Sequence, residues 1–262
     1  MRPPAVLTRR QAIVRAGAVG LAAGAAPLLA GCDALNGSPG FRKILGLGED
    51  MHRHTQRVLQ TPHGFAKEFA QSDISPVFRS NGTAMPGGAD YAAHIASRFA
   101  DWRIPVTGLV ARPLDLSMAD IRSGPQRTQI TRHDCVEGWS AIGQWTGVPL
   151  NRVLKAAGLR DTARYIVFRC ADTLGLGSVP YYESIDLTDA LHPQTLLAWR
   201  LNGELLPVKN GAPLRLRVER QLGYKHAKYV NAIEAVASLD GIGRGMGGYW
   251  EDASNYEWYA GI

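Results

Sequence analysis

Residues 130–150 read ITRHDCVEGWSAIGQWTGVPL, a stretch dense in reactive and aromatic side chains. Its first residues favour a β-strand, which places Cys135 at the end of that strand beside Arg132 and His133. Neighbouring cations lower the pKa of a thiol and favour the thiolate. Three roles for Cys135 stay open on the residues alone: a buried small side chain, a disulfide with Cys170, or a nucleophile paired with His133.

A second motif lies further along the chain. Residues 210–215 read NGAPLR, and residues 223–228 read GYKHAK. Together with the segment from Arg132 to Leu150, these stretches resemble the sulfite oxidase family of molybdenum enzymes, which includes methionine sulfoxide reductases and bacterial sulfite dehydrogenases. The resemblance covers roughly residues 61–236. It implies an α+β protein with the sulfite oxidase fold, in which mixed β-sheets and short flanking helices bind molybdenum in a molybdopterin cofactor.

The resemblance also implies roles for individual residues. It makes Cys135 the molybdenum ligand, which suits a soft thiolate. The residues that match the family's cofactor contacts are Asn81, Thr173, Asn210, Arg215, His226, Ala227 and Lys228. Arg offers a planar fork of donors to phosphate oxygens, and Lys offers a compact charge. His226 stands where the family usually has serine, so a hydroxyl contact is lost there while a backbone contact can remain.

Three further residues are candidates for catalysis. Arg132 could attract an anionic substrate, although it could equally contact the cofactor. Tyr181 and Tyr182 could line the mouth of the active site, where a phenol can relay a proton, and packing roles fit these two tyrosines equally well.

The N-terminal residues 1–32 are typical of an export signal. Arg9 and Arg10 form the pair of a twin-arginine signal, and an uncharged run follows from Ala16 to Leu29. Residues 29–32 read LAGC and resemble a bacterial lipobox, so we expect a periplasmic protein with a possible lipid anchor at Cys32; the alternative is a soluble periplasmic protein cut nearby. We interpret residues 33–60 as a tether with a short helix from Glu49 to Leu59.

Composition limits the partners of the chain. The formal net charge is +6, but residues 1–32 hold four arginines and no acid, which leaves +2 on residues 33–262 and gives no reason to expect nucleic acid. No Cys-x-x-Cys occurs in the sequence, so it offers no motif for an iron–sulfur cluster or a c-type haem. We therefore expect electrons to be exchanged with a separate cytochrome, either a c-type protein or a haem-bearing membrane subunit.

The region from residue 61 to residue 262 is expected to be one catalytic domain. Runs rich in β-forming residues predict strands over 104–110, 127–132, 165–170, 195–201, 214–219 and 229–236. Asn202 and Gly203 predict a tight hairpin turn, and helices are expected over 117–122 and 149–157. The glycine-rich run 243–248 lacks a following dinucleotide-binding helix, and the aromatic tail 249–259 is expected to pack over the domain.

The expected function is two-electron oxygen-atom transfer on a small oxyanion, a sulfoxide or an N-oxide. Two alternatives come from other classes of protein. One is a lipid-anchored binding module that kept the fold without the metal, and the other is a cysteine-nucleophile enzyme that uses Cys135 and His133.

Overall fold

The computed structural model describes residues 38–59, 64–175 and 179–262, so the expected signal and the possible anchor at Cys32 lie outside the described residues. The chain divides into two compact units, residues 1–55 and 56–262. Helix α2 (Pro39–Leu59) begins ten residues before the predicted short helix. Apolar Ile44, Leu47 and Met51 recur at helical spacing along it, and all three side chains are exposed. No described helix is long and apolar enough to cross a membrane.

The first sheet of the larger unit has five strands in the described residues. In spatial order they are β2 (Leu114–Ser117), β1 (Arg103–Gly108), β10 (Val230–Val236), β5 (Tyr165–Leu174) and β6 (Val179–Asp186). β1 and β10 run parallel, with Val106 opposite Ile233, and the other neighbours are antiparallel. Ile104, Ile166 and Ile233 are fully buried in the main core on this sheet.

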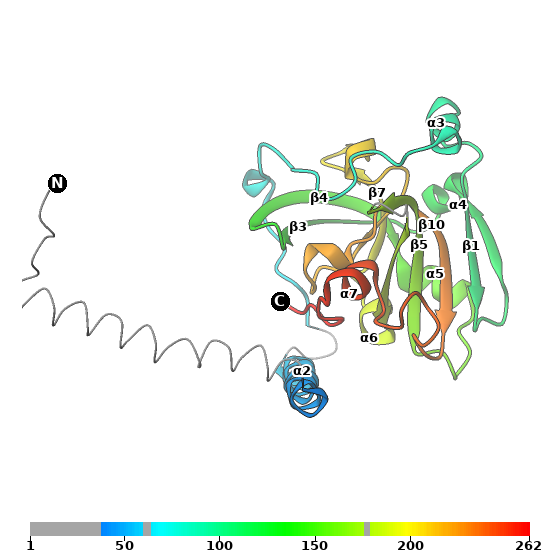
Figure 1. Cartoon of the computed structure of the whole chain (residues 1–262). Coiled ribbons are helices and arrows are strands. Elements are labelled where there is room, and N and C mark those ends of the chain that lie inside the picture. The colour runs from blue at the N-terminus through cyan, green and yellow to red at the C-terminus, as the bar shows by residue number, and fades with distance from the viewer. Residues whose placement is uncertain (1–37, 60–63, 176–178) are drawn as a thin grey trace, which may run out of the picture. The chain divides into compact units, whose positions relative to one another are not determined.

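The second sheet holds the segment that contains Cys135. Its strands are β3 (Arg127–Cys135), β4 (Trp139–Pro149), β7 (Leu196–Leu201) and β8 (Glu204–Leu205), and β9 (Arg215–Arg217) pairs with β7. In Figure 1, β3 and β4 extend as a curved pair away from β1, β10 and β5, which stand side by side. A bulge between Thr146 and Gly147 lets β4 approach β7, where a Cβ on Gly147 would lie 2.3 Å from the carbonyl oxygen of Leu197.

Short helices and turns connect the strands. They are η1 (Gln71–Asp73), α3 (Ala89–Ala96), α4 (Met118–Ser123), α5 (Leu150–Ala157), α6 (Leu187–Ala190), η2 (Val208–Asn210), η3 (Gly223–Lys225) and α7 (Tyr249–Ser254). Ser117 caps α4, and Gly158 ends α5 in a left-handed conformation. Asn202 and Gly203, with φ of 52° and 83°, form the predicted turn between β7 and β8.

The six predicted strands are present, and four more were not predicted: β2, β4, β6 and the two-residue β8 that follows the predicted hairpin turn. β2 is short, β4 contains Gly143 and Gly147, and β6 contains Pro180 near its start, so none shows a clean run of β-forming residues. A second difference concerns the C-terminal tail, where the short helix α7 follows the glycine-rich run directly.

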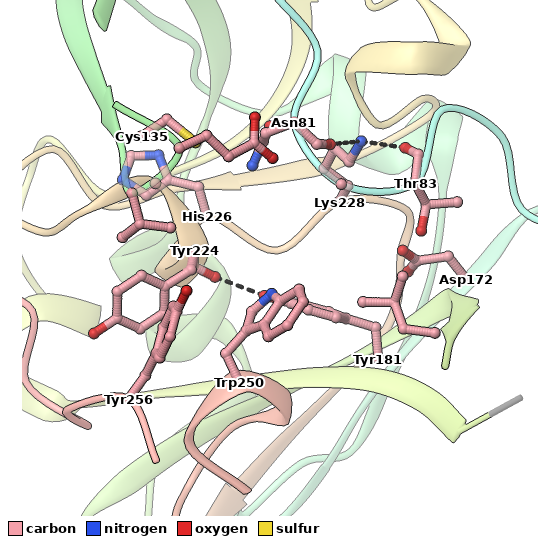
Figure 2. A pocket seen from close by; sticks show the side chains of 15 residues that line it. Asn81, Thr83, Cys135, Asp172, Tyr181, Tyr224, His226, Lys228, Trp250 and Tyr256 are labelled. Carbon is pink, nitrogen blue, oxygen red and sulfur yellow. Dashed lines mark hydrogen bonds between the residues drawn. The ribbon is translucent and has the colours of Figure 1, made fainter. Parts of the chain in front are cut away.

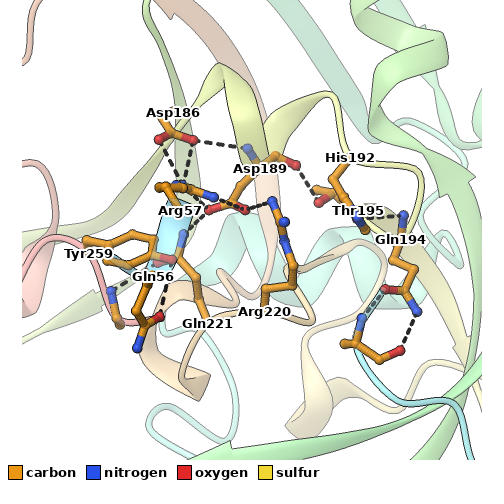
Figure 3. Close-up of polar contacts among 12 residues, drawn as sticks. Gln56, Arg57, Asp186, Asp189, His192, Gln194, Thr195, Arg220, Gln221 and Tyr259 are labelled. Atoms are coloured by element: carbon orange, nitrogen blue, oxygen red, sulfur yellow. Dashed lines mark hydrogen bonds and ion pairs between the residues drawn. The ribbon is translucent and has the colours of Figure 1, made fainter. Parts of the chain in front are cut away.

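An ionic network within the larger unit surrounds Asp189 and includes Arg57, which lies in the last turn of α2 (Figure 3). The guanidinium of Arg57 donates to both carboxylate oxygens of Asp189 at 2.8 and 3.0 Å, and to Asp186 at 2.9 and 3.0 Å. Arg220 and Gln221 also donate to Asp189, whose side chain is almost fully buried. Burial would raise the pKa of Asp189, but the hydrogen bonds and charges of Arg57 and Arg220 outweigh burial and lower it.

We predict that Asp189→Asn destabilises the protein by about 3–5 kcal/mol at pH 7, because the buried Arg220 and the partly buried Arg57 lose their shared carboxylate. A lowered carboxyl pKa stabilises the fold above the ordinary pKa and ceases to do so as the pH falls through the folded-state value. The difference from the unsubstituted protein should therefore shrink below about pH 4. Urea unfolding at several pH values measures it.

The matched control for this prediction is Asp161→Asn, which changes an exposed aspartate outside the network. Equal stability of the two variants at neutral pH would contradict the assignment, as would a difference that persists unchanged in acid.

Candidate functional site

A pocket lies where the end of β3, the end of β5, β6, η3 and α7 meet (Figure 2). The residues that line it are Asn81, Gly82, Thr83, Cys135, Val136, Glu137, Asp172, Leu174, Tyr181, Gly223, Tyr224, His226, Lys228, Trp250 and Tyr256. Polar groups and aromatic rings occupy opposite sides of the pocket in Figure 2. Cys135, Asn81, His226 and Lys228, predicted from separate motifs, all contribute to its wall.

Strand alternation determines which side chains of β3 reach the site. Thr131, His133 and Cys135 are buried on one face, whereas Arg132 is exposed and belongs to the opposite face. The guanidinium of Arg132 pairs with Asp134 at 2.9 Å and lines a different pocket. The structure therefore does not bring Arg132 to Cys135. The alternation of side chains along a strand could have predicted this, because three positions separate the two residues.

The expectation of a thiolate held by two neighbouring cations is wrong. Burial raises the pKa of Cys135, and Arg132 points away from it. His133 is fully buried, and its burial lowers its pKa well below the usual value, so the ring is neutral. Cys135 and Cys170 are both free thiols, which excludes the disulfide between them. A metal ion would be needed to hold Cys135 as a thiolate here.

Two buried cations stand behind the polar side of the pocket. Arg215 is fully buried, and it donates to the carbonyl oxygen of Asn210 and to Oδ1 of Asn81, both at 3.2 Å. Lys228 donates to the carbonyl oxygens of Asn81 at 2.6 Å, of Lys209 at 3.1 Å and of Thr83. Burial lowers the pKa of Lys228 to about 7 and that of Arg215 to about 9.

A second arginine fixes the histidine beside Cys135. Nη1 of Arg217 lies 2.9 Å from Nδ1 of His133, and Arg217 also forms a buried ion pair with Glu219. Because an arginine can only donate, Nδ1 of His133 accepts and Nε2 carries the proton. Gly223 packs against this ring so closely that a Cβ there would lie 2.6 Å from Nε2.

Several predicted site residues lie away from the pocket wall. Ala227 is buried in the core, and Asn210 is buried beneath Arg215. Tyr181 lines the pocket and donates to the carbonyl oxygen of Tyr224 at 2.7 Å, whereas Tyr182 alternates to the other face and bonds Asp252. Thr173 lines a separate pocket.

Ten of the fifteen described residues that line the pocket were not predicted from the sequence, and four of these bear on its chemistry. Asp172 takes the place that Thr173 was expected to fill, because it occupies the inward position of β5. Glu137, two residues after Cys135, accepts a hydrogen bond from Trp139 at 3.0 Å. Trp250 and Tyr256 come from the aromatic tail. Alternation along β5 could have revealed Asp172, but nothing in the sequence places the tail against the pocket.

The donors around the pocket fit an anionic cofactor with a phosphate and a ring edge. Within the described residues, neither Arg215 nor Lys228 forms an ion pair with a carboxylate, and Nε of Arg215 and Nε2 of His133 are buried without a hydrogen-bond partner. The described residues contain no cluster of three side chains that could hold a metal ion. A metal bound through Cys135 would therefore need most of its ligands from a cofactor.

Comparison with known proteins also indicates a cofactor-binding domain. A model of the oxidoreductase molybdopterin-binding domain matches residues 92–240, which include Cys135, Arg215 and Lys228. The chain belongs to this family. The α+β fold class expected from the sequence is confirmed, and the chain is a molybdopterin-dependent oxidoreductase. Family membership speaks against a metal-free binding module. The raised pKa of Cys135 and the occupied Nδ1 of His133 speak against a cysteine nucleophile.

Relatives within the family include named methionine sulfoxide reductases. A putative protein-methionine-sulfoxide reductase subunit, YedZ1, from Azospira oryzae is 36% identical over 91% of this chain and 83% of its own length. The catalytic subunits MsrP of Xanthomonas campestris and Ralstonia nicotianae are 38% and 35% identical over 54% and 61% of this chain. The matches span 47% and 50% of these two MsrP proteins, about half their length.

One solved structure is also similar to this chain. The sulfane dehydrogenase SoxCD from Paracoccus pantotrophus matches with a TM-score of 0.48 and 24% identity, over 53% of this chain and 39% of that chain.

We predict that Lys228→Ala lowers cofactor affinity by about 10- to 100-fold, the effect of losing one charge-assisted hydrogen bond to a buried anion. Arg132→Ala should load molybdenum as the unsubstituted protein does, because Arg132 faces away from the pocket. Metal analysis of both purified variants, with titration of the apo-proteins by isolated cofactor, tests this. Equal occupancy in the two variants would contradict the role of Lys228.

Proposed function

We propose that this protein reduces sulfoxides, with methionine sulfoxide as the preferred substrate. The reaction converts R₂SO, two electrons and two protons into R₂S and water. The observation that supports it best is a pocket that has Cys135 on its wall, one aromatic side and little positive charge. The printed names of the relatives point to the same substrate.

The charge of the pocket favours a neutral substrate over an oxyanion such as sulfite. Among the described lining residues, Lys228 is the one side-chain cation, and backbone carbonyls already surround its ammonium group. Glu137 and Asp172 add carboxylates, and Arg132 is absent from the lining. Because Lys228 is assigned to the cofactor's phosphate, an anionic substrate would meet the carboxylates of Glu137 and Asp172 with no further side-chain cation in the described lining, whereas a sulfoxide is polar at one end and apolar elsewhere.

In this proposal Cys135 binds molybdenum, and Arg215 and Lys228 hold the cofactor's phosphate. Asn81, Asn210 and His226 offer amide and ring groups to the pterin, and Ala227 offers its backbone. The bound cofactor would supply the two-electron oxygen-atom chemistry. Tyr181 orients the aromatic side by its bond to Tyr224, while Thr173 and Tyr182, which lie away from the wall, have no direct role.

The electrons come from a separate haem protein in this proposal, because the sequence offers no motif for an iron–sulfur cluster or a c-type haem. The relatives' names, "subunit" and "catalytic subunit", agree with such a division of labour. We further propose export through the twin-arginine signal at Arg9 and Arg10 to the periplasm, with a lipid anchor at Cys32. Twin-arginine export suits a protein that folds around its cofactor before it crosses the membrane.

The test compares Cys135→Ser with Cys170→Ser in protein made by a host that synthesises the cofactor. Cys135→Ser should abolish sulfoxide reduction by dye-coupled assay, because a hard hydroxyl replaces a soft ligand of similar shape. Cys170→Ser should keep activity, since Cys170 is a buried free thiol that does not line the pocket. Full activity in Cys135→Ser, or unsubstituted protein that loads molybdenum but oxidises sulfite and reduces no sulfoxide, would overturn the proposal.

A further inference from the structure

The aromatic side of the pocket comes from a segment outside the matched domain. The family model ends at residue 240, whereas Trp250 and Tyr256 line the pocket from α7 and the residues after it. The two rings stack with centroids 5.8 Å apart and an interplanar angle of 24°. Tyr256 also meets the ring of Tyr224 edge-on at 5.1 Å. The C-terminal segment thus contributes the Trp250 and Tyr256 side of a pocket whose other described lining residues lie before residue 240.

A buried ion pair fixes the position of this aromatic side. Nζ of Lys225 lies 2.6 Å from Glu251 and 2.5 Å from Glu183, and all three side chains are fully buried. The ion pair between Lys225 and Glu251 joins η3 to α7. Each of these elements also presents a ring to the pocket, because Tyr224 precedes Lys225 and Trp250 precedes Glu251. A Cβ at Gly248 would lie 2.1 Å from the Glu251 carboxylate, so α7 begins tightly against the ion pair.

Hydrogen bonds hold the rest of the segment. The indole of Trp258 donates to the hydroxyl of Ser184 at 2.9 Å, and the hydroxyl of Tyr224 donates to the carbonyl oxygen of Glu257 at 2.6 Å. The amide of Leu222 donates to Ala260 at 2.9 Å. The aromatic rings are therefore fixed against the pocket along the whole segment, which is the condition for a wall that discriminates between ligands.

We propose that Trp250 and Tyr256 determine substrate specificity by binding the methyl group, sulfur and side-chain carbons of methionine sulfoxide, with the sulfoxide oxygen toward the polar side. The inference rests on the proposed function. Thioether-type sulfur and methyl groups pack favourably against aromatic rings, and a longer apolar substrate covers more of the wall than dimethyl sulfoxide does. The wall thus selects an amphipathic sulfoxide on a hydrocarbon chain over a minimal one.

The experiment measures KM and kcat for a methionine sulfoxide peptide and for dimethyl sulfoxide, together with molybdenum content. Trp250→Leu should raise KM for the peptide about tenfold, because it removes ring contacts worth about that factor, with a smaller change for dimethyl sulfoxide. Trp250→Phe keeps a ring and should restore most of the preference. The matched control is Trp199→Leu, which changes a tryptophan outside the pocket and should leave both substrates unaffected.

The outcomes separate the two proposals. Unsubstituted, metal-loaded protein that reduces no sulfoxide overturns the proposed function. If that protein is active but Trp250→Leu keeps its ratio of KM values with full metal content, the specificity assignment is wrong and the proposed function stands. If Trp250→Leu loses its metal, the same ratio of KM for the peptide to KM for dimethyl sulfoxide is measured in Tyr256→Leu and Trp250→Phe. A ratio that is unchanged in both of these variants overturns the assignment.

Discussion

The buried positive charge beside the pocket is the constraint on which the rest of the site depends. Arg215 and Arg217 are both fully buried in one short strand, and Lys228 lies close to Arg215. Glu219 pairs with Arg217, but in the described residues the hydrogen bonds of Arg215 and Lys228 go only to carbonyl and amide oxygens. Burying a charge without a directly paired counter-ion is costly, so an anion that binds here would stabilise the arrangement. Burial, together with the charge of these cations, lowers the pKa of His133 and keeps it neutral, which leaves its Nε2 proton available as a donor at the site.

Much of this arrangement could be predicted from the sequence, and the successes share a physical cause. Motifs that fold locally, such as residues 210–215 and 223–228, place their polar groups by short-range geometry, and the predicted site residues Lys228 and His226 line the same pocket. Strand alternation is also local, and it could have prevented two wrong assignments. Arg132 and Thr173 were assigned to the site, although the period of two puts Arg132 on the face of β3 opposite Cys135 and Thr173 on the face of β5 opposite Asp172.

Features of the site that could not be predicted from the sequence depend on packing between distant segments of the chain. The raised pKa of Cys135 comes from burial by elements that the local sequence does not specify. Trp250 and Tyr256 read as a packing tail, and their place on the wall depends on an ion pair between residues 225 and 251 and on contacts with β6. Residues that reach the pocket from a distant part of the chain show no periodic pattern in their own stretch of sequence that would indicate this role.

The parallel pairing of β1 with β10 has a consequence for how the protein is made. It joins Val106 to Ile233, so the central strand pair of the first sheet needs two segments that lie far apart in the sequence. A sheet closed by such distant partners has a high contact order and folds slowly compared with one built from hairpins. Until β10 docks, β1 and β5 each present an unpaired edge, which is the feature that promotes aggregation of incomplete chains. Closure of the first sheet therefore waits until β10 has been synthesised, and the incomplete chain depends on protection until then.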